Sequence, residues 1–533
     1  MSNPASYQGI ALVCPVTLGY SKTSEHSASW FIGSVLRELI GNAGISKQDI
    51  DGLAISSFSL APDSVSFLTQ HFNMTTRWLE QLPFGGASGI LALRRAARAV
   101  QSGDADIVAC IGGDTAVKGS FRDLVADFST FSNSASYPYG SAGPNAAFAL
   151  ITQRYMEEYG ATREDFGQLA VSQRYNALHF DGALLGKQPL TMEDYLAARS
   201  ISSPLHLFDC VMPCAGGEGF LAMSIERAES LDLPYVTILA ADERHNAFPD
   251  DTTQLRGGWP LFCQSLYQRA GLAPADIDLL QTYDDYPVIS MLQLEGLGFC
   301  DMGEAPTFLR ENALTFDGGG LPHNTSGGQL SNGQAGAAAG YLGAGGIHSP
   351  VNRRRCGQPG TRRATRHGQR LRHDQLRPRP VQRSGDIAGR QGLMITFQTG
   401  LPASATLTLQ QCGNCAAVNY PSRELCGNCL ANALQWQPVK DTGTVQSITE
   451  LQYSLEPGYS AHLPWSVASI QLDCGPQAIA HLVPGIAIGD PVTLKPIQDA
   501  QGNVMLLAMG RDNAAQQAAT RWLEKVQFKE ISA

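Results

Sequence analysis

The sequence lacks the features of a membrane protein and of a nucleic-acid-binding protein. No apolar run reaches about 18 residues, so we expect no transmembrane helix. The first residues carry no basic stretch ahead of an apolar one, so we expect no signal peptide. Acidic residues outnumber basic ones, 48 to 38, which argues against nucleic acid as the main partner. The twelve cysteines are therefore expected to be reduced thiols in the cytoplasm.

Two loop patterns of cofactor-dependent enzymes are also missing. Neither GxGxxG nor a P-loop occurs, so nothing supports nicotinamide or ATP chemistry. An apolar content of 43% and a charged content of 16% are typical of a packed globular protein. With 533 residues, the chain is long enough for two or more domains.

Lysine and glutamate are absent from residues 352–390. This stretch holds twelve of the 38 basic residues, all of them arginine, and two aspartates, Asp374 and Asp386. Arginine at this density cannot form a buried strand, because removing so many charges from water costs too much free energy. The stretch is either a basic linker that binds an acidic surface or the product of a shifted reading frame.

Two segments of the chain echo each other. Residues 43–55 read AGISKQDIDGLAI, and residues 270–282 read AGLAPADIDLLQT. Each follows an amphipathic helical pattern and runs into a short apolar strand, with Gly44 and Gly271 as predicted C-caps. The echo indicates two similar halves. Chance recurrence of helix-end residues is the alternative.

A second unit follows in the first half. A helix, a turn and a buried strand are predicted over 88–114, after the glycine run at 85–88. Its counterpart begins with the glycine-rich loop and helix start at 323–340. The closing strand should follow at about 360–380, where the arginine-rich stretch stands instead.

These segments together resemble the thiolase superfamily, in particular the sterol-carrier-type thiolase-like proteins known as lipid-transfer proteins. The resemblance covers most of residues 5–345. It implies a duplicated α/β domain with αβαβα layers that forms a homodimer. The matching segments are GISKQDIDGLAI, FGGASG, AARAVQSGDADIVACIGGD, YPYGSAGPNAAFALITQRYMEEYGAT, TYDDYPVISMLQLEGLGFC and HNTSGGQLSNG.

A one-base shift would explain the arginine-rich stretch. GC-rich codons for residues 366–383, read one base later, give Gly-Thr-Ala-Asn-Gly-Phe-Gly-Met-Ile-Asn-Tyr-Asp-Arg-Gly-Leu-Cys-Ser-Gly, which resembles the final strand pair of the family. Continued, this frame ends in a stop codon that overlaps an ATG at Met394. We therefore interpret the chain as two adjacent genes read as one, and sequencing of the coding DNA would decide.

The region after Met394 carries a metal-binding pattern. Cys412, Cys415, Cys426 and Cys429 form CxxC-x10-CxxC, a spacing that suits one tetrahedral, structural zinc ion. Short alternating strands separated by turns follow and predict a small OB-like barrel. The pair resembles the small partner subunits of lipid-transfer thiolase-like proteins. Because the barrel lacks a basic, aromatic-rich face, acyl-CoA handling or partner docking is expected of it.

The predicted architecture is α/β, with a small zinc ribbon and an all-β OB-like barrel after the duplicated thiolase-like domain. If the two parts are separate subunits, a heterotetramer replaces the homodimer. The expected boundaries are 1–347 for the thiolase-like domain without its last strands, 348–393 for the arginine-rich linker, 394–437 for a helix and the zinc ribbon, 438–515 for the barrel, and 516–533 for a tail.

The nucleophile and the base of a working thiolase are replaced in this sequence. By the resemblance, Gly86 stands where the nucleophilic cysteine would stand, and Gln334 stands where the activating histidine would stand. The second cysteine would fall in the arginine-rich stretch. Claisen condensation through an acyl-cysteine is therefore not expected.

Other polar and glycine residues remain as candidates. The two glycine-rich loops can aim backbone N–H groups at one carbonyl oxygen, although they could also be plain tight turns. Tyr283 follows the second-copy strand and could act as a general acid or base, the alternative being a core aromatic. The candidates are Tyr283, Asp284 and Tyr286 for catalysis, and Gly85, Gly86, Ser88, Asn324, Gly327 and Gly328 for the oxyanion and substrate.

The resemblance extends to a reaction. Some relatives are retro-aldolases that cleave 3-hydroxyacyl-CoA side chains in steroid degradation, need a zinc-ribbon and OB partner, and use two tyrosines. Tyr283 matches one, and the other would be encoded out of frame across Leu376 and Arg377. We therefore expect a C–C lyase with CoA as part of its substrate. The alternatives are an acyltransferase without the standard cysteine and a non-catalytic lipid or acyl-CoA carrier.

Overall fold

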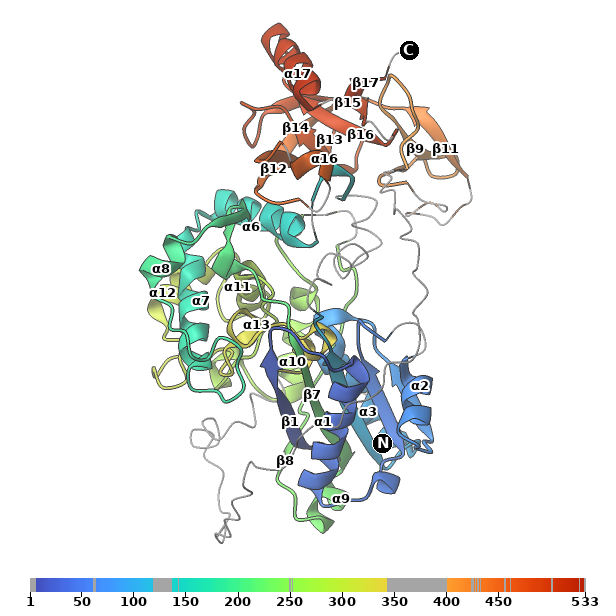
Figure 1. Cartoon of the computed structure of the whole chain (residues 1–533), viewed down its shortest axis with the longest axis vertical. Helices are drawn as coiled ribbons and strands as arrows, with labels where there is room; N and C mark the ends of the chain where they lie inside the picture. The colour runs from blue at the N-terminus through green and yellow to red at the C-terminus, as the bar shows by residue number, and fades with distance from the viewer. Residues whose placement is uncertain are drawn as a thin grey trace.

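The computed structural model has two parts joined along the chain (Figure 1). The first part runs to residue 342, and the second begins at residue 400. None of the helices in the described part of the chain has the length and apolar character that crossing a membrane requires. The structure describes residues 6–60, 64–117, 137–141, 143–248, 251, 253–342, 400–422, 426, 428, 431, 433–454, 457–460, 462–499, 502–526 and 528–531.

A mixed six-stranded sheet forms the centre of the first part, in the order β3-β2-β4-β7-β1-β8. β2 pairs in parallel with β3 and β4, and the remaining pairs are antiparallel. β2 and β4 are buried along their whole length, as expected for strands covered on both faces. The strands are β1 (Ile10–Ser21), β2 (Gly52–Ser56), β3 (Trp78–Gln81), β4 (Ile107–Asp114), β7 (Ala215–Ser224) and β8 (Tyr235–Thr237).

Helices cover both faces of this sheet. On one face, Ile32, Val35 and Leu39 of α1 (Ala28–Ala43) pack against β1, β2 and β4. On the other, Leu91 and neighbouring alanines of α3 (Ser88–Ser102) pack against the same strands. Both helices bury one apolar stripe, which is the periodicity that predicted them. Two shorter helices, α2 (Ser64–His71) and α9 (Ile225–Ser230), pack into the same core as α1.

The internal echo is confirmed at its turns. Gly44 and Gly271 both end helices in the left-handed conformation, with φ of 63° and 69°. In each copy a carboxylate, Asp49 or Asp276, accepts the backbone N–H three residues earlier at 2.7 Å. The copies are α1 with η1 (Lys47–Asp49) and α10 (Cys263–Ala270) with η6 (Pro274–Asp276).

The predicted second sheet is not found among the described residues. The second-copy strand reduces to one bridge between Leu280 and His323. A strand needs hydrogen-bonding neighbours, and the predicted closing strands and the arginine-rich linker fall in 343–399, outside the described residues. Further helices follow each copy. After the first copy come α6 (Asn145–Tyr159), α7 (Arg163–Ala177) and α8 (Met192–Leu196), and after the second come α11 (Pro287–Gly296), α12 (Ala305–Glu311), α13 (Gly328–Asn332) and η7 (Gly336–Tyr341).

The second part contains the predicted barrel. Its five strands close because β15 pairs with both β16 and β12. The residues beyond 515, predicted as a tail, instead complete α17 (Asn513–Val526) and form β17 (Lys529–Glu530), and Ala519 and Leu523 lie in the barrel core. The barrel strands are β12 (Thr442–Leu451), β13 (Trp465–Leu472), β14 (Gln477–Leu482), β15 (Pro491–Gln498) and β16 (Val504–Met509).

A small three-stranded sheet precedes the barrel. It is formed by β9 (Thr408–Cys412), β10 (Val418–Asn419) and β11 (Leu434–Pro438), in the order β10-β9-β11. The helix predicted ahead of the zinc ribbon does not occur within the described residues of 400–437. Cys412 ends β9, Cys415 lies between β9 and β10, and Cys426 lies between β10 and β11.

The two parts share a sheet and a core. The hairpin of β5 (Ser200–Ser203) and β6 (Leu205–His206), from the first part, extends the barrel sheet beyond β12. The fully buried Tyr139 of the first part lies in the barrel core, where its hydroxyl contacts Tyr420 at 3.2 Å. In Figure 1, α6 lies directly below the barrel.

Candidate functional site

Three polar side chains form a hydrogen-bonded trio, and two of them lie just before α11. Tyr283 donates its hydroxyl proton to Asp285 Oδ2 at 2.6 Å. Gln334, from the loop before η7, donates from Nε2 to Asp285 Oδ1 at 2.7 Å and lies 3.4 Å from the Tyr283 hydroxyl. Asp285 therefore receives one donor on each carboxylate oxygen.

The ring of Tyr283 occupies the space above Gly86. A Cβ atom built on Gly86 would lie 1.6 Å from a Tyr283 ring carbon. No side chain fits at position 86 while the tyrosine keeps its place. The absence of a side chain at position 86 thus makes room for the tyrosine.

Burial sets the protonation of the trio. Desolvation raises the pKa of Asp285 to about 7, although the hydrogen bonds from Tyr283 and Gln334 favour its charged form. Desolvation, followed by the Asp285 charge, holds the pKa of Tyr283 well above its usual value. Near neutral pH the phenol is therefore protonated, and Asp285 is the member of the trio that titrates.

Asp284, a predicted catalytic residue, anchors the second glycine loop. Its carboxylate accepts the backbone N–H groups of Gln329 at 2.9 Å and Leu330 at 3.3 Å. A Cβ on Gly328, where φ is 59°, would lie 2.1 Å from Asp284 Oδ2. Desolvation raises the pKa of Asp284 to about 7. The Asp284 carboxylate therefore serves mainly to hold the backbone of the second glycine loop in place.

Two other candidates make structural contacts. Tyr286 donates its hydroxyl to Asn145 Oδ1 at 2.6 Å, and its ring stacks on Phe148 at 4.3 Å. Ser88 is fully buried at the start of α3, and its hydroxyl donates to the Leu82 carbonyl at 3.0 Å. Both side chains fix the backbone beside the trio.

The remaining loop residues shape the turns. The side-chain oxygen of Asn324 accepts the Thr282 N–H at 2.8 Å, which joins the second glycine loop to the segment that carries Tyr283. Gly85 and Gly327 have φ of 56° and 101°, values that favour glycine. A Cβ at Gly327 would also meet Ala177 at 2.5 Å.

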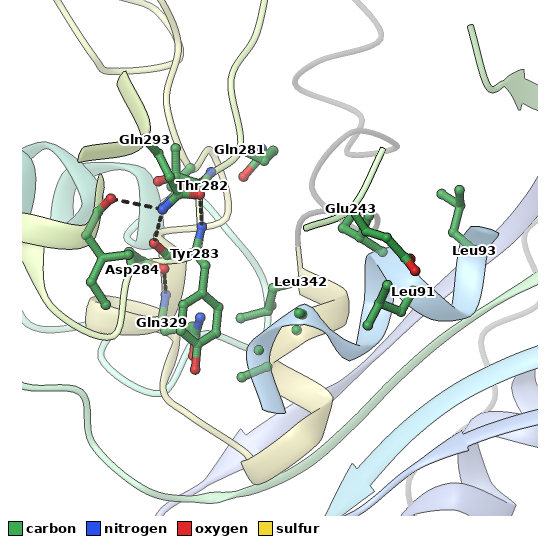
Figure 2. A pocket seen from close by; sticks show the side chains of 18 of the residues that line it. Leu91, Leu93, Glu243, Gln281, Thr282, Tyr283, Asp284, Gln293, Gln329 and Leu342 are labelled. Atoms are coloured by element: carbon green, nitrogen blue, oxygen red, sulfur yellow. Dashed lines mark hydrogen bonds between the residues drawn. The ribbon is translucent and has the colours of Figure 1, made fainter. Parts of the chain in front are cut away.

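A large cavity lies against Tyr283. Its volume is about 620 Å³, within the range of ligand pockets. Figure 2 shows Gln281, Thr282 and Tyr283 on one side of it and Leu91, Leu93 and Glu243 on the other. Among the described residues, Ser326 Oγ and Gln329 Oε1 are buried in its wall without a partner. Its lining includes the predicted Gly86, Tyr283, Asp284, Asn324 and Gly328, but not Gly85, Ser88, Gly327 or Tyr286.

A smaller cavity touches the other members of the trio. Its volume is about 120 Å³, and Asp285, Tyr286 and Gln334 line it together with residues from both parts of the chain. The trio therefore stands between the two cavities. Asp285 was missed as a site residue by sequence reasoning, although it lies in the Tyr-Asp-Asp-Tyr run. Neighbouring residues after a strand point to opposite sides, so two adjacent carboxylates could have been assigned different roles.

Three of the four predicted metal ligands lie together. The Sγ atoms of Cys412, Cys415 and Cys426 are within 4.8 Å of one another, and Cys429 lies outside the described residues. The N–H groups of Asn414 and Asn428 each lie 3.4 Å from a cysteine Sγ, where they stabilise thiolates. A cluster of thiolates fits zinc.

Two segments of the chain match described domain families. Residues 244–344 match the Thiolase C-terminal domain-like family. Residues 436–495 match the ChsH2 C-terminal OB-fold domain family. The first match includes the trio, and the second covers most of the barrel.

Relatives of the whole first part include characterised enzymes. A steroid side-chain-cleaving aldolase of Thermomonospora curvata is 32% identical, over 58% of this chain and 83% of the relative. A 17-hydroxy-3-oxo-4-pregnene-20-carboxyl-CoA lyase of Mycobacterium tuberculosis is also 32% identical, over 84% of its length. The solved Ltp2-ChsH2(DUF35) aldolase is 29% identical, with a TM-score of 0.54 over 63% of this chain and 92% of that chain.

Proposed function

The chain belongs to the thiolase-like family of the steroid side-chain-cleaving aldolases, and from that premise we propose that it cleaves a 3-hydroxyacyl-CoA thioester by a retro-aldol reaction. One observation carries the proposal. Tyr283, hydrogen-bonded to Asp285, fills the place of a nucleophile above Gly86 and faces a large cavity. This arrangement suits proton transfer and leaves no room for an acyl-enzyme.

Proton transfer begins at the substrate hydroxyl. Tyr283 takes the 3-hydroxyl proton as its own proton passes to Asp285, whose carboxylate already accepts it at 2.6 Å. The O–H electrons form the new carbonyl, the Cα–Cβ bond breaks, and its electron pair moves into the thioester enolate. Tyr283 then delivers its proton to Cα and takes back the proton held by Asp285, which restores both groups. The products are a ketone or aldehyde and a shortened acyl-CoA, and no free CoA is consumed.

The glycine loops stabilise the enolate in this proposal. Gly86 and Gly328 line the same cavity from opposite halves of the first part, so their backbones can face one oxygen. Donors that are fixed before the reaction stabilise developing negative charge without reorganising. Ser326 and Gln329 add buried polar atoms that await a partner.

The cavity indicates a bulky apolar substrate group. Its lining is mainly apolar, with Leu91, Phe220, Trp259 and Leu342 among the contributors. Burial of such a group supplies binding free energy away from the reacting bond. We propose a polycyclic or long-chain lipid as this group, in line with the steroid named for the relatives.

The second part is proposed to hold one structural zinc ion. Cys412, Cys415, Cys426 and Cys429 would bind it as thiolates, which fits a reducing cytoplasm. The ion would stabilise the ribbon and take no part in catalysis. We propose a homodimer through the first part, or a heterotetramer if the two parts are separate chains.

Product analysis tests the function. The chain as printed and a frame-restored chain are incubated with a 3-hydroxyacyl-CoA that carries a bulky apolar group. In the frame-restored chain we expect equal amounts of a carbonyl product and a shortened acyl-CoA. Turnover that needs free CoA or an acyl acceptor would support an acyltransferase instead, and tight binding without turnover in both chains would support a carrier.

A further inference from the structure

The smaller cavity is built by both parts of the chain. Asp285 and Gln334 line it from the first part, and Tyr453 lines it from just after strand β12 of the barrel. The trio proposed for catalysis is therefore reached from a space that the barrel helps to enclose. Two prolines of the first part, Pro144 and Pro213, form stiff portions of the wall.

The shared sheet fixes where Tyr453 lies. Leu451 of β12 pairs with Ser202 of β5, and the Gln452 N–H donates to the Ile201 carbonyl at 3.1 Å. These contacts hold the backbone immediately before Tyr453 against the first part. Backbone pairing between the two parts thus positions the ring at the cavity.

Buried side-chain contacts reinforce this pairing. The hydroxyls of Ser202 and Thr449 lie 2.7 Å apart, and Thr449 Oγ1 also donates to the Ser203 carbonyl at 2.8 Å. Both hydroxyls are buried, so these bonds do not exchange freely with water. The strand end that carries Tyr453 is therefore anchored on both backbone and side chain.

The Tyr453 side chain itself is free for a ligand. It is 51% exposed, and among the described residues its hydroxyl has no hydrogen-bond partner. The ring is therefore available to contact a ligand in the cavity.

The chemistry of the wall selects a neutral group. The described lining holds the carboxylates Asp114 and Asp285 and no lysine, arginine or histidine. The phosphates of CoA do not fit beside these carboxylates. A volume of about 120 Å³ admits only a few non-hydrogen atoms. A short, uncharged alkyl group meets both conditions.

We propose that Tyr453 is a specificity-determining residue, which limits the size of the substituent at C2 of the substrate. The ligand identity rests on the proposed function. With the bulky C3 group in the large cavity, the C2 substituent points past Tyr283 toward Asp285 and into the smaller cavity. Tyr453 closes that cavity, so substituents longer than a methyl or ethyl group meet its ring.

Binding of thioesters that cannot be cleaved tests this proposal. Octanoyl-CoA, 2-methyloctanoyl-CoA and 2-butyloctanoyl-CoA lack a 3-hydroxyl and differ only in the branch. Calorimetry on the full chain should show the butyl-branched thioester binding at least about tenfold more weakly than the methyl-branched one. Tyr453→Ala should remove most of this difference, whereas Tyr453→Phe should keep it.

A matched control separates the cavity wall from general loss of an aromatic residue. Trp436 of β11 is also a partly exposed aromatic of the second part but does not line the cavity. Trp436→Ala should keep the branch discrimination, and all variants should keep the parent Tm. A butyl penalty unchanged in Tyr453→Ala, or relieved equally by Trp436→Ala, overturns the proposal.

Turnover, measured separately, distinguishes the two proposals. Relief of the branch penalty in Tyr453→Ala without retro-aldol activity in any chain supports the role of Tyr453 and overturns the proposed reaction. Retro-aldol activity without relief of the branch penalty supports the proposed reaction and overturns the role of Tyr453. Failure of all three thioesters to bind overturns both.

Discussion

Tyr283 and Gly86 are structurally dependent on each other. The tyrosine ring lies where any side chain at position 86 would be. Its hydroxyl reaches Asp285, which in turn accepts from Gln334. Gly86 leaves room for the tyrosine ring and Gln334 donates to Asp285, so both positions support the hydrogen-bonded trio.

Removing the Tyr283 hydroxyl tests its role in proton transfer. In the frame-restored chain, Tyr283→Phe keeps the ring above Gly86 and should lower kcat by about a hundredfold or more, because the relay to Asp285 is broken. The chain should stay folded, with a loss of about 1–3 kcal/mol from the lost hydrogen bond. Cleavage at the parent rate would show that this residue is not the proton carrier.

A thiol at position 86 should not restore thiolase chemistry. Gly86→Cys forces the Tyr283 ring out of place, and Gln334 cannot take a proton from the thiol. Gly86→Ala is the matched control, because it creates the same clash without a thiol. Both variants should lose lyase activity and Tm to a similar degree. Thiolase turnover by Gly86→Cys alone would contradict this account.

The raised pKa of Asp285 predicts opposite effects of pH on activity and stability. The base form is needed, so kcat/KM should rise with pH through about 7. Stability contributed by the buried neutral carboxyl is full below its usual pKa of 3.8 and is lost as pH rises through about 7. Asp284 shifts in the same direction and adds to the loss.

Asp285→Asn supplies the control for this pH dependence. Melting curves from pH 4 to 8 should show a smaller decline in Tm for the variant than for the parent chain. Its activity should be low at every pH. A variant whose melting curves fall as steeply as those of the parent would assign the pH dependence to other groups.

At the scale of elements, short-range chemistry was predictable from sequence. The helix ends at Gly44 and Gly271 and the spacing of Cys412, Cys415 and Cys426 depend on residues close together in the chain. The second-half sheet was predicted but is not found in the described part of the chain. A strand depends on partners distant in sequence, and the residues predicted to supply them, within 343–399, lie outside the described residues. Likewise, nothing in the sequence of β5 marks it as an extension of a barrel more than 200 residues away.

The cysteine cluster predicts metal-dependent folding of β9–β11. Chelation, or Cys415→Ser, should unfold this ribbon, since metal binding supplies its folding free energy. Cys474→Ser changes a cysteine of the barrel outside the cluster and should have little effect on the folding of the ribbon. Elemental analysis should find one zinc per chain in the parent and in Cys474→Ser. Freshly purified protein without zinc would refute the site.

For the whole molecule, Tyr139 is a residue of the first part that lies buried in the core of the barrel. Tyr139→Ala should lower stability by about 3–5 kcal/mol and separate the unfolding of the two parts in calorimetry, because a large buried ring is lost from the barrel core. Tyr139→Phe keeps the ring and removes only the contacts with Tyr420 and the Leu506 N–H. It should cost about 1–3 kcal/mol and leave one transition. A single transition in both variants would place the connection elsewhere.

The pairing of β5 with β12 also has a consequence for biosynthesis. It covers the end of a barrel edge, at Glu450 and Leu451, that would otherwise present unpaired backbone groups. Uncovered strand edges recruit strands from other molecules and begin aggregation. Where both parts are translated as one chain, the hairpin leaves the ribosome first and can receive the barrel as it folds. A barrel produced without the hairpin would expose an unpaired strand edge that is prone to aggregation.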